Sequence, residues 1–491
     1  MDMETSKPII YFVEKGLYKA RLNHLTALAE KSNFLKVNKN YSNQVTHVLA
    51  QDCTKLQVLQ FLKKVKKLKP DELSWENQKF VNISWFTSCM KEKELVPVLE
   101  THLLKDEDED IGVPSKKLKL EEKIPMYACQ RSSPLNHKNK IFTDALEVLE
   151  EHALYRGDQN ADARSLAFRR GSSTLKSLKH KISHINDLKN LPHIDIGGSS
   201  KPGHCKRVII DILANGHSTE VEEVSSNEFY QTMKLFCGIF GVGPQTARKW
   251  FYDLKLRTLD DVKNCSSISL NRDQSYGLEY YEDLNSPLPL LDAKRIENHI
   301  REVATSIQEG IEVILVGGFR RGKQVGHDID LLITHPENRK EKILHKILDK
   351  LKDEFVYTDK KAGTTENPYH AAKVTSTSQS TTDHFEKCYG IFKVDKTDKA
   401  AGENHKRTWT ARRVDLIVVP YSQFPFAVLG WTGSKHFERE IRRYSKSEKQ
   451  IVLTSHGMYT LEGKQNIPAS SEKEIFELLG LEYQDPEDRN C

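Results

Sequence analysis

Alternating strand-like and helical patterns occupy the first hundred residues. Apolar residues fill positions 9–13, which predicts a strand, and the apolar positions within 22–29 follow the spacing of a helix. A second strand is predicted at 45–49, where valine, threonine and leucine cluster. The alternation of the two patterns predicts a small α/β domain over residues 1–100.

The segment VNISWFTSCM closes this first pattern. We expect Ser84 to cap a helix that buries Trp85, because a hydroxyl can accept a free N–H group of the first helical turn. The order of strand, helix, VTHVLA, helix and VNISWFTSCM resembles a BRCT domain, in which Trp85 would be the core tryptophan. The resemblance implies a module that recruits the chain to a partner.

Residues 101–125 follow neither pattern. Five acidic residues at 106–110 precede the basic stretch PSKKLK at 114–119. Blocks of like charge repel one another and stay solvated, so this segment is predicted to be a linker. A basic cluster after a proline also resembles a nuclear import signal, and a merely solvated linker is the alternative.

Helical spacing returns at Phe142 and continues to about residue 260. Within this region, IFGVGP places Gly241 and Gly243 just before a new helix. Glycines let the backbone approach a phosphate closely, and the start of a helix offers free N–H groups. We therefore expect both glycines to lie at a phosphate-binding turn, and an ordinary glycine-bearing turn between helices is the alternative.

The IFGVGP motif resembles a helix-hairpin-helix, which binds the DNA backbone without reading its sequence. The resemblance implies a monovalent cation, Na⁺ or K⁺, held by the backbone carbonyls of Cys237, Ile239 and Val242.

A glycine turn rich in basic residues, GGFRRGK at 317–323, follows a strand-like apolar run. Gly317, Gly322 and Lys323 match the spacing of a P-loop, but Gln324 stands where that motif requires a metal-binding Ser or Thr. A P-loop also needs a helix after its lysine, whereas HDIDLLI predicts a strand. A P-loop NTPase is therefore excluded.

Two aspartates, Asp328 and Asp330, are two residues apart on that predicted strand, so both carboxylates project from one face. Asp415 interrupts a further apolar run, VDLIVV, where a lone buried carboxylate would be costly. Clustered carboxylates repel one another unless a cation neutralises them. Three of them on neighbouring strands can hold two Mg²⁺ ions about 3.5–4 Å apart, the arrangement for in-line phosphoryl transfer. A solvated strand edge is the alternative for a D-x-D alone.

GGFRRGK followed at a fixed short distance by the D-x-D strand resembles the nucleotidyltransferase fold and, within it, the family X DNA polymerases. The resemblance covers almost the whole chain and implies a multidomain protein of α/β and α+β class. The predicted divisions are a BRCT domain at 1–100, a linker at 101–125, a helical 8-kDa-type DNA-binding domain at 126–225, a helix-hairpin-helix fingers subdomain at 226–286, a nucleotidyltransferase palm at 287–424 with a loop at 363–382, and a small α/β thumb at 425–491.

The same resemblance implies roles for individual residues. Asp328, Asp330 and Asp415 would be catalytic and would hold two Mg²⁺ ions, for which Mn²⁺ can substitute. The implied nucleotide-binding residues are Gly317, Gly318, Arg321, Lys323, His327, Gly430, Trp431 and Gly433. The implied DNA-binding residues are Gly241, Gly243, Lys387, Arg413, Lys435 and Arg442.

Gly430 and Trp431 stand where strict deoxynucleotide-selecting members of the family carry Tyr-Phe. A tyrosine there fixes a backbone that crowds the sugar 2′ position, whereas glycine can relax and leave room for a hydroxyl. We therefore expect tolerance of ribonucleotides. Trp431 as a plain core aromatic is the alternative.

A weaker hairpin signal at 191–198 resembles the first hairpin of these polymerases. In members that form a Schiff base with an abasic sugar, a lysine occupies the position that aligns with Val208. A valine cannot act as an amine nucleophile, so lyase activity is doubtful, although Lys206 lies nearby.

The loop at 363–382 is rich in Ser and Thr and has no periodicity, which is typical of functional or disordered segments. In the family such a loop substitutes for a template strand or yields to one. The motif DHFEKC follows it, and the resemblance implies that Lys387 and His327 help to hold the primer end. A plain surface insertion is the alternative.

The overall composition adds three limits. The 491 residues are enough for about three domains, and 74 Lys and Arg against 69 Asp and Glu leave a net charge of only +5, so any basic DNA-binding surface must be local. The eight cysteines include no Cys-x-x-Cys pair, so reduced thiols are expected. No apolar run approaches the roughly 18 residues of a membrane helix and no signal peptide pattern begins the chain, so we expect a soluble intracellular protein without membrane contact.

The leading hypothesis is a nuclear, monomeric DNA polymerase that extends 3′ ends during double-strand break repair by non-homologous end joining, including V(D)J recombination. It would fill gaps, tolerate ribonucleotides and add some nucleotides without a template. The expected partners are DNA ends and gapped or broken duplexes, deoxynucleoside and ribonucleoside triphosphates, and Ku and the ligase complex through the BRCT domain. The alternatives are a dedicated template-independent terminal transferase and a non-catalytic BRCT scaffold that binds DNA ends.

Overall fold

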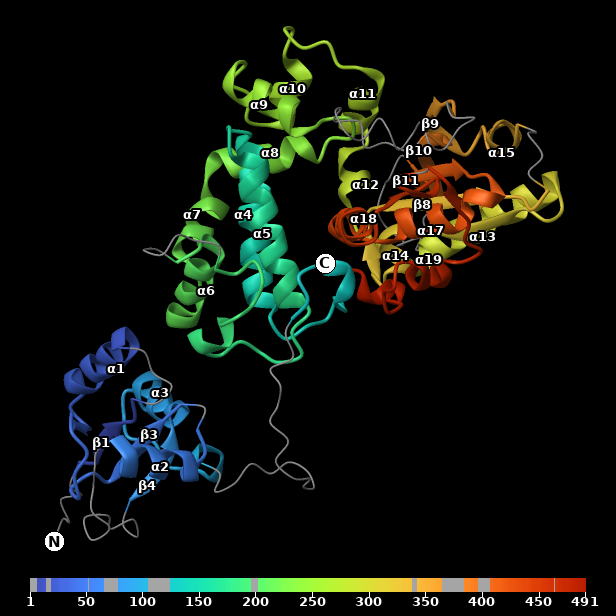
Figure 1. Cartoon of the computed structure of the whole chain (residues 1–491). Helices are drawn as coiled ribbons and strands as arrows, with labels where there is room; N and C mark the ends of the chain where they lie inside the picture. The colour runs from blue at the N-terminus through green and yellow to red at the C-terminus, as the bar shows by residue number, and fades with distance from the viewer. Residues whose placement is uncertain are drawn as a thin grey trace. The chain divides into compact units, whose positions relative to one another are not determined.

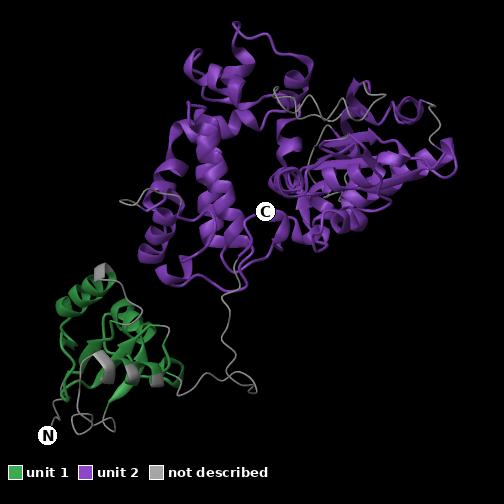
Figure 2. Ribbon diagram, viewed as in Figure 1, with its two compact units in different colours: residues 1–122 green, residues 123–491 purple. Residues whose placement is uncertain are grey.

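The structure is a computed structural model that describes residues 7–14, 19–51, 53–65, 78–104, 124–195, 202–337, 342–363, 384–395, 407–462 and 464–491. The chain divides into two compact units, unit 1 with residues 1–122 and unit 2 with residues 123–491 (Figure 1; Figure 2). The division falls within the segment predicted as a linker, most of which lies outside the described residues.

Unit 1 is built on a four-stranded parallel sheet in the order β2-β1-β3-β4. Its elements are β1 (Ile9–Phe12), α1 (Lys19–Lys31), β2 (Lys36–Val37), β3 (His47–Ala50), α2 (Lys55–Val65), β4 (Lys79–Asn82) and α3 (Ile83–Glu92). Apolar side chains are buried in two clusters, as expected where crossover helices cover a parallel sheet. The alternating order of strands and helices follows the sequence pattern, and the BRCT assignment stays a prediction.

Trp85 lies in the core of unit 1, with 1% of its surface exposed. Its indole N–H donates to the carbonyl of Val96 at 2.9 Å, which satisfies the one polar group of the buried ring. The prediction that Ser84 caps α3 is wrong. Asn82 is the N-cap and accepts the N–H of Ser84 at 2.9 Å, because α3 begins one residue before Ser84.

The folded part of unit 1 extends beyond residue 100. Leu104 is buried, and its N–H donates to the carbonyl of Phe80 at 2.9 Å. Val81 forms a β-bridge with Leu103. The first four residues of the predicted linker therefore belong to unit 1.

Unit 2 begins with two helical groups, each with its own core. The first group is α4 (Lys140–Arg156), α5 (Ala161–Lys176), α6 (His204–Asn215) and α7 (Thr219–Ser226). The second is α8 (Glu228–Cys237), α9 (Pro244–Tyr252), α10 (Leu259–Asn264), α11 (Arg272–Glu279) and α12 (Tyr281–Asn285). The helical region thus continues past the predicted end near 260.

The palm of unit 2 is a five-stranded sheet in the order β6-β8-β11-β10-β9. Strands β8 and β11 are parallel, and the other neighbours are antiparallel. The elements are β5 (Leu288–Pro289), α13 (Leu290–Ile307), β6 (Glu312–Leu315), α14 (Gly317–Arg320), β7 (Val325–Gly326), β8 (Asp328–Thr334), α15 (Ile343–Lys350), β9 (Phe355–Lys361), β10 (Glu386–Asp395) and β11 (Trp409–Val418).

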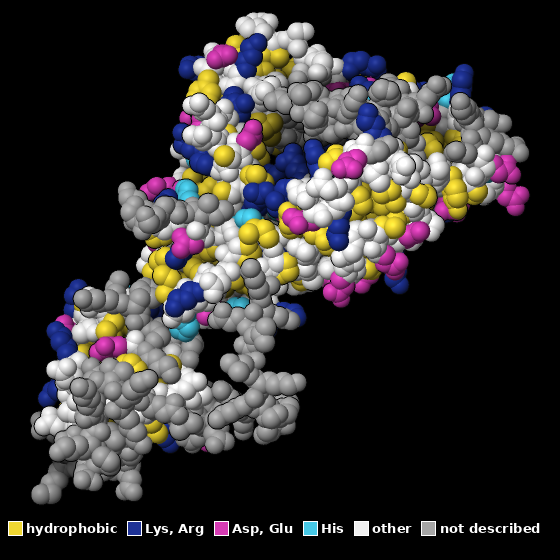
Figure 3. Space-filling view, in the orientation of Figure 1, with side chains coloured by type: hydrophobic (Ala, Val, Ile, Leu, Met, Phe, Trp, Pro, Cys, Tyr) yellow, Lys and Arg dark blue, Asp and Glu magenta, His cyan; other side chains and the backbone are white. Residues whose placement is uncertain are grey.

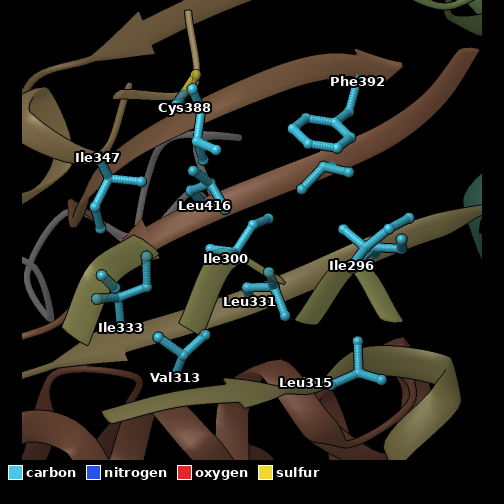
Figure 4. Close-up of a cluster of buried hydrophobic side chains, with 14 of the residues drawn as sticks. Ile296, Ile300, Val313, Leu315, Leu331, Ile333, Ile347, Cys388, Phe392 and Leu416 are labelled. Carbon is cyan, nitrogen blue, oxygen red and sulfur yellow. The ribbon is translucent and has the colours of Figure 1, made fainter. Parts of the chain in front are cut away.

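One face of the palm sheet is covered by α13 and α15. Ile296 and Ile300 of α13 and Ile347 of α15 pack on strand residues such as Leu331 and Leu416 (Figure 4). This buried face leaves the other face of the same strands, where alternate residues point, for polar side chains near the strand ends.

The thumb follows with α17 (Phe424–Thr432), α18 (Lys435–Lys449), α19 (Glu472–Leu478) and a small sheet of β12 (Ile451–Thr454), β13 (Gly457–Thr460) and β14 (Asn466–Ile467). The helices and the small sheet enclose one apolar core.

Part of the segment assigned to the helical domain also packs on the thumb. Cys129 is buried in the thumb core, and Tyr127 packs against it. Ser133 pairs with the far end of the chain, since its N–H donates to the carbonyl of Asp488 at 2.7 Å. We call residues 124–133 the strap. Arg131 of the strap also donates to the hydroxyls of Ser173 and Thr174 of α5, both at 3.0 Å, so the strap joins the thumb to the helical domain, and the boundary at 126 stays a prediction.

A buried ion cluster joins the palm to the thumb. Glu472 accepts hydrogen bonds from Arg320 of the glycine turn, at 2.6 and 3.2 Å, and from Arg489 at 2.6 Å. Arg489 is 0% exposed. Burial alone would raise the pKa of Glu472, but the bonds from Arg320 and the charge of Arg489 lower it below its ordinary value. Arg320 is thus a structural residue of the palm–thumb junction.

No helix in the described ranges is long and apolar enough to cross a membrane. All eight cysteines lie in these ranges as free thiols.

We predict that Glu472→Ala destabilises unit 2 by about 3–5 kcal/mol, because it leaves the buried Arg489 guanidinium without a carboxylate. Urea unfolding of the full chain measures the loss. The matched control is Glu474→Ala on the same helix, whose side chain is half-buried and whose carboxylate bonds Ser470 and no arginine in the described residues. Equal losses in the two variants would contradict the assignment.

Candidate active site

The glycine turn and the first acidic strand meet directly. After β6, Gly317 adopts φ +65°, a conformation that side-chain-bearing residues rarely take. A Cβ atom at Gly317 would lie 2.5 Å from Oδ2 of Asp330, so only glycine lets this carboxylate approach the turn. The turn and the acid therefore form one site.

Strand register brings the three aspartates together. On β8, Asp328 and Asp330 point to one face, while Ile329 and Leu331 are buried in the palm core. Asp330 pairs with Asp415 across the parallel β8–β11 ladder. The predicted gathering of the three acids on neighbouring strands agrees with this geometry.

Burial and mutual repulsion act on these carboxylates. Burial raises the pKa of Asp330 first, and the charges of Asp415 and Asp328 raise it further. Burial also raises the pKa of Asp415, although the nearby Arg413 lowers it. Without a cation, the site therefore favours protonated carboxyls.

Arg413 lies among the acids. Its guanidinium donates to Oδ2 of Asp415 at 2.7 Å, lies 4.0 Å from Asp328 and packs on the ring of Phe240 at 4.9 Å. A side chain therefore already supplies one positive charge beside the acids. The predicted role of Arg413 in DNA binding stays a prediction.

The donor set fits magnesium. All the candidate ligands are carboxylate oxygens, which Mg²⁺ prefers. Oδ1 of Asp415, whose residue is 4% exposed, is buried without a hydrogen-bond partner, so it is free to take a cation. Within the described ranges, no three His, Cys, Asp or Glu side chains are already drawn close enough to hold an ion.

The basic residues of the glycine turn differ in their surroundings. Arg321 donates to the carbonyl of Thr432 at 2.7 Å and to Oδ1 of Asn490 at 3.0 Å, and burial lowers its pKa. Lys323 packs its stem on Gly318 and is exposed. Lys323 is thus the cation of the turn that faces outward, and Arg321 also ties the turn to the thumb.

The Gly-Trp-Thr-Gly segment ends α17 next to this turn. A Cβ atom at Gly430 would lie 3.2 Å from Cβ of Ser455 and 3.3 Å from the guanidinium of Arg442. Gly433 lies against the carboxylate of Glu438. Glycine at these positions therefore makes room for side chains of the thumb.

Glu438 is a residue that the motifs did not indicate. Burial raises its pKa to about 7, and Arg442 opposes that shift from 3.7 Å away. The spacing of four residues on one helix could have signalled this pair. The contact of Arg442 with DNA stays a prediction, and in the structure its guanidinium faces the carboxylate of Glu438.

Trp431 is half-buried and packs on the palm cluster that includes Leu332 and Ile417. The ammonium of Lys387 lies 5.9 Å from the centre of its ring, and Lys387 is 5% exposed. His327, next to Asp328, is exposed. Residues 364–382 of the predicted template-related loop lie outside the described residues.

The predicted hairpin lies between α8 and α9. Gly241 has φ +81°, and a Cβ atom there would lie 2.6 Å from Cβ of Asp273. Gly243 is the N-cap of α9, with open space at its Cα. The carbonyl of Ile239 accepts the N–H of Val242 at 3.0 Å and closes the turn. The cation site on the carbonyls of Cys237, Ile239 and Val242 stays a prediction.

Lys206 and Val208 lie on α6 in the first helical group. Val208 is buried in its core, and Lys206 forms an ion pair with Asp195 at 2.5 Å. Val208 has no amine, and the amine of Lys206 is held in an ion pair. Neither residue therefore offers a free amine nucleophile for lyase chemistry.

Basic side chains gather around the hollow of unit 2. Figure 3 shows Lys and Arg side chains lining the central depression, while acidic side chains are spread over the outer surface of this face. The local basic surface that a net charge of +5 requires is therefore present.

Three family models match unit 2. They are the fingers domain of DNA polymerase lambda at residues 234–285, the DNA polymerase beta palm at 288–421 and the DNA polymerase beta thumb at 427–490. DNA-directed DNA/RNA polymerase mu of Homo sapiens is 37% identical over 98% of this chain and 94% of its own length. The chain belongs to DNA polymerase family X.

Two further family X relatives are terminal transferases by name. DNA nucleotidylexotransferase of Xenopus laevis is 35% identical over 98% of this chain and 93% of its own length. The Homo sapiens enzyme of that name is 34% identical over 100% and 94%. Family X membership makes the chain a DNA nucleotidyltransferase, as predicted. The segments DLLITHP and YSQFPFAVLGWTGSK resemble polymerase mu more than the transferase, and the similarity of the whole chain to polymerase mu confirms this recognition.

We predict a pH-dependent stability that depends on Asp330. Its raised pKa means that the folded protein keeps a proton that the unfolded chain releases above pH 3.8, so stability falls as pH rises towards neutral. In EDTA, Asp330→Asn should remove this part of the slope and stabilise the protein by about 1–3 kcal/mol near neutral pH.

Urea unfolding of the two proteins across that pH range measures the difference. Adding Mg²⁺ should stabilise the native protein more than the variant. Parallel pH profiles in EDTA would show that Asp330 is not the titrating group.

Proposed function

We propose that this chain is a polymerase mu-like enzyme that extends DNA 3′ ends during double-strand break repair by non-homologous end joining. It fills gaps under template direction, accepts ribonucleotides and adds some nucleotides without a template. The observation that supports this most is the direct contact between the glycine turn and the aspartate cluster at Asp330. That contact puts a phosphate-binding turn and acidic metal ligands in one site.

Each residue has a role in the proposed reaction. Asp328, Asp330 and Asp415 hold two Mg²⁺ ions, or Mn²⁺ in their place. Bound metal supplies charge neutralisation for the attacking 3′-hydroxyl and the leaving pyrophosphate. Gly317, Gly318 and Lys323 bind the triphosphate, because the turn combines backbone N–H groups with an outward cation.

Arg413 contacts two of the three acids. Its guanidinium bonds Asp415 at 2.7 Å and holds that carboxylate in place, whereas Asp328 lies 4.0 Å away. Asp415 still has its second oxygen free for a cation. Arg413 therefore orients Asp415 and does not replace the metal.

Ribonucleotide tolerance is assigned to Gly430. The absence of a side chain lets Ser455 and Arg442 approach α17 closely, and the conformational freedom of glycine lets this backbone relax around a 2′-hydroxyl. Trp431 and Gly433 complete the sugar and base pocket, and His327 and Lys387 support the primer end.

Unit 1 is proposed to be a BRCT domain that recruits the enzyme, as a monomer in the nucleus, to Ku and the ligase complex at DNA ends, including ends formed in V(D)J recombination. The parallel sheet with Trp85 in its core supports this assignment. The hairpin with Gly241 and Gly243, with Na⁺ or K⁺ on its carbonyls, and the basic residues Lys435 and Arg442 bind the DNA.

A dedicated terminal transferase is the second candidate, supported by the similarity to DNA nucleotidylexotransferases. A single-stranded primer without template separates the two. Rapid untemplated extension that exceeds gap filling would favour the transferase.

We predict that Asp330→Ala lowers extension of a gapped primer at least about a thousandfold, because the site loses one of the carboxylates that neutralise the reacting phosphates. Gel-based primer extension with Mg²⁺ measures the rate. Asp349→Ala, an exposed aspartate of α15, is the matched control. If the Asp330 variant still extends the primer, the catalytic assignment is wrong, and loss of extension with retained end binding excludes a mere scaffold.

We predict that Gly430→Ala raises discrimination against ribonucleotides about tenfold, and Gly430→Tyr more. A tenfold change equals about 1.4 kcal/mol, within the usual cost of crowding a packed site. The ratio of kcat/KM for a deoxynucleotide and its ribonucleotide is the measurement. Adding Ser455→Gly to Gly430→Ala should restore tolerance, because it removes the Cβ that the new methyl group meets. Unchanged discrimination in both single variants would refute the role of Gly430.

A further inference from the structure

A large cavity lies beside the glycine turn. It has a volume of about 730 Å³ and is bordered by α4 and α5 on one side and by Arg321, Lys323 and the start of α18 on the other. None of the three aspartates borders it, nor does Trp431. The cavity thus adjoins the proposed triphosphate position through Arg321 and Lys323 but is a separate space.

The charges on the helical wall of the cavity balance one another. Three of its four acids form ion pairs, which are Lys140–Asp144 at 2.7 Å, Lys176–Glu147 at 2.8 Å and Arg169–Glu150 at 2.5 Å. The fourth acid, Glu151, accepts the hydroxyl of Tyr230 at 2.5 Å, and Lys234 on the same wall balances its charge. Paired charges contribute little net field at a distance. The opposite wall therefore decides the sign of the cavity.

The opposite wall carries three cationic side chains and no acidic side chain. Its lining residues are Arg321, Lys323, Ser434, Lys435, His436, Asn490 and Cys491. Lys435 is exposed at the first position of α18. The three cationic side chains outnumber the terminal carboxylate of Cys491 and face a wall of balanced charge, so the cavity attracts an anion.

The start of α18 adds backbone donors. This helix has 15 residues, and its N-cap Ser434 accepts the N–H of Phe437 at 3.2 Å. The N–H groups of Lys435 and His436 lie in the first turn of α18, where backbone N–H groups have no carbonyl acceptor within the helix. The helix dipole favours an anion at the same end.

His436 is the second, independent sign of a ligand. It borders the cavity, is 2% exposed, and neither of its ring nitrogens has a hydrogen-bond partner in the structure. Burial, with Arg169, Arg131 and Arg170 nearby, lowers its pKa to about 3, so the ring is neutral and keeps one N–H to donate. A buried polar ring without a partner is costly, and a phosphoryl oxygen would satisfy it.

We propose that this cavity is a second anion site, which receives the pyrophosphate released by nucleotide addition. The proposal rests on the proposed function, which puts the triphosphate on the glycine turn. Pyrophosphate fits because Arg321 and Lys323 border both spaces, so the leaving group passes from one set of cations to the next. His436 and the N–H groups of α18 then bind it away from the aspartates.

Direct binding tests the site without catalysis. Sodium pyrophosphate is titrated into the full chain in EDTA by calorimetry. Binding is expected for the native chain, and His436→Leu should weaken it about tenfold or more, as for a lost bond to a charged group. His436→Gln, which keeps a donor, should recover most of the affinity.

Further variants make the test specific. Lys435→Gln, at an exposed position, should also weaken binding, which keeps the test valid if His436→Leu does not fold. His456→Leu is the matched control, because His456 is the other buried histidine of the thumb and does not border the cavity. Asp330→Ala should bind pyrophosphate like the native chain even though it cannot extend a primer. Failure of the polymerase assignment is thereby separated from failure of this site.

Kinetics distinguish a release site from general damage to α18. In His436→Leu, the inhibition constant of pyrophosphate in primer extension should rise several-fold while the KM for the nucleotide stays within about twofold. Absence of binding in EDTA, binding unaffected by His436→Leu and Lys435→Gln, equal affinity for orthophosphate, or an equal rise in KM would each overturn the proposal.

Discussion

Three carboxylates forced together at the junction of β8 and β11 are the constraint on which this molecule depends. Parallel register sets Asp330 opposite Asp415, and the two-residue period of β8 adds Asp328 on the same face. Asp330 and Asp415 are the buried members of this group, and burying two carboxylates requires a cation near them. Arg413 supplies one positive charge, and its packing on Phe240 connects the acids to the hairpin between α8 and α9.

The glycine turn is held in place from the thumb side. Arg320 reaches Glu472, and Arg321 reaches the carbonyl of Thr432 at the end of α17. Two adjacent arginines that look like a phosphate-binding pair in the sequence thus hold palm and thumb together. This leaves Lys323 as the outward cation of the turn and makes the position of the thumb part of the geometry of the site.

Buried acidic side chains of the thumb lie next to arginines. Glu438 lies beneath Gly433 beside Arg442, and Arg489 has Glu472 as its carboxylate. His436, in contrast, is buried with neither ring nitrogen paired. The net charge of the chain is only +5, but basic side chains from distant parts of the sequence are concentrated around the hollow of unit 2.

The sequence by itself determined the local chemistry: the alternation of unit 1, the D-x-D strand, the glycine turn and the hairpin all follow from short-range periodicity and from glycine's freedom at Gly241 and Gly317. Such features depend on neighbours within a few residues, so pattern alone can predict them. The predicted N-cap of α3 was wrong because the helix begins at Ile83, one residue before Ser84. The tertiary structure alone decided that the strap joins the thumb, that Arg413 lies between the acids, and that His436 borders a cavity with Lys323. Those contacts join residues separated by tens to hundreds of positions, and no local propensity specifies which distant side chain will neutralise or bury another.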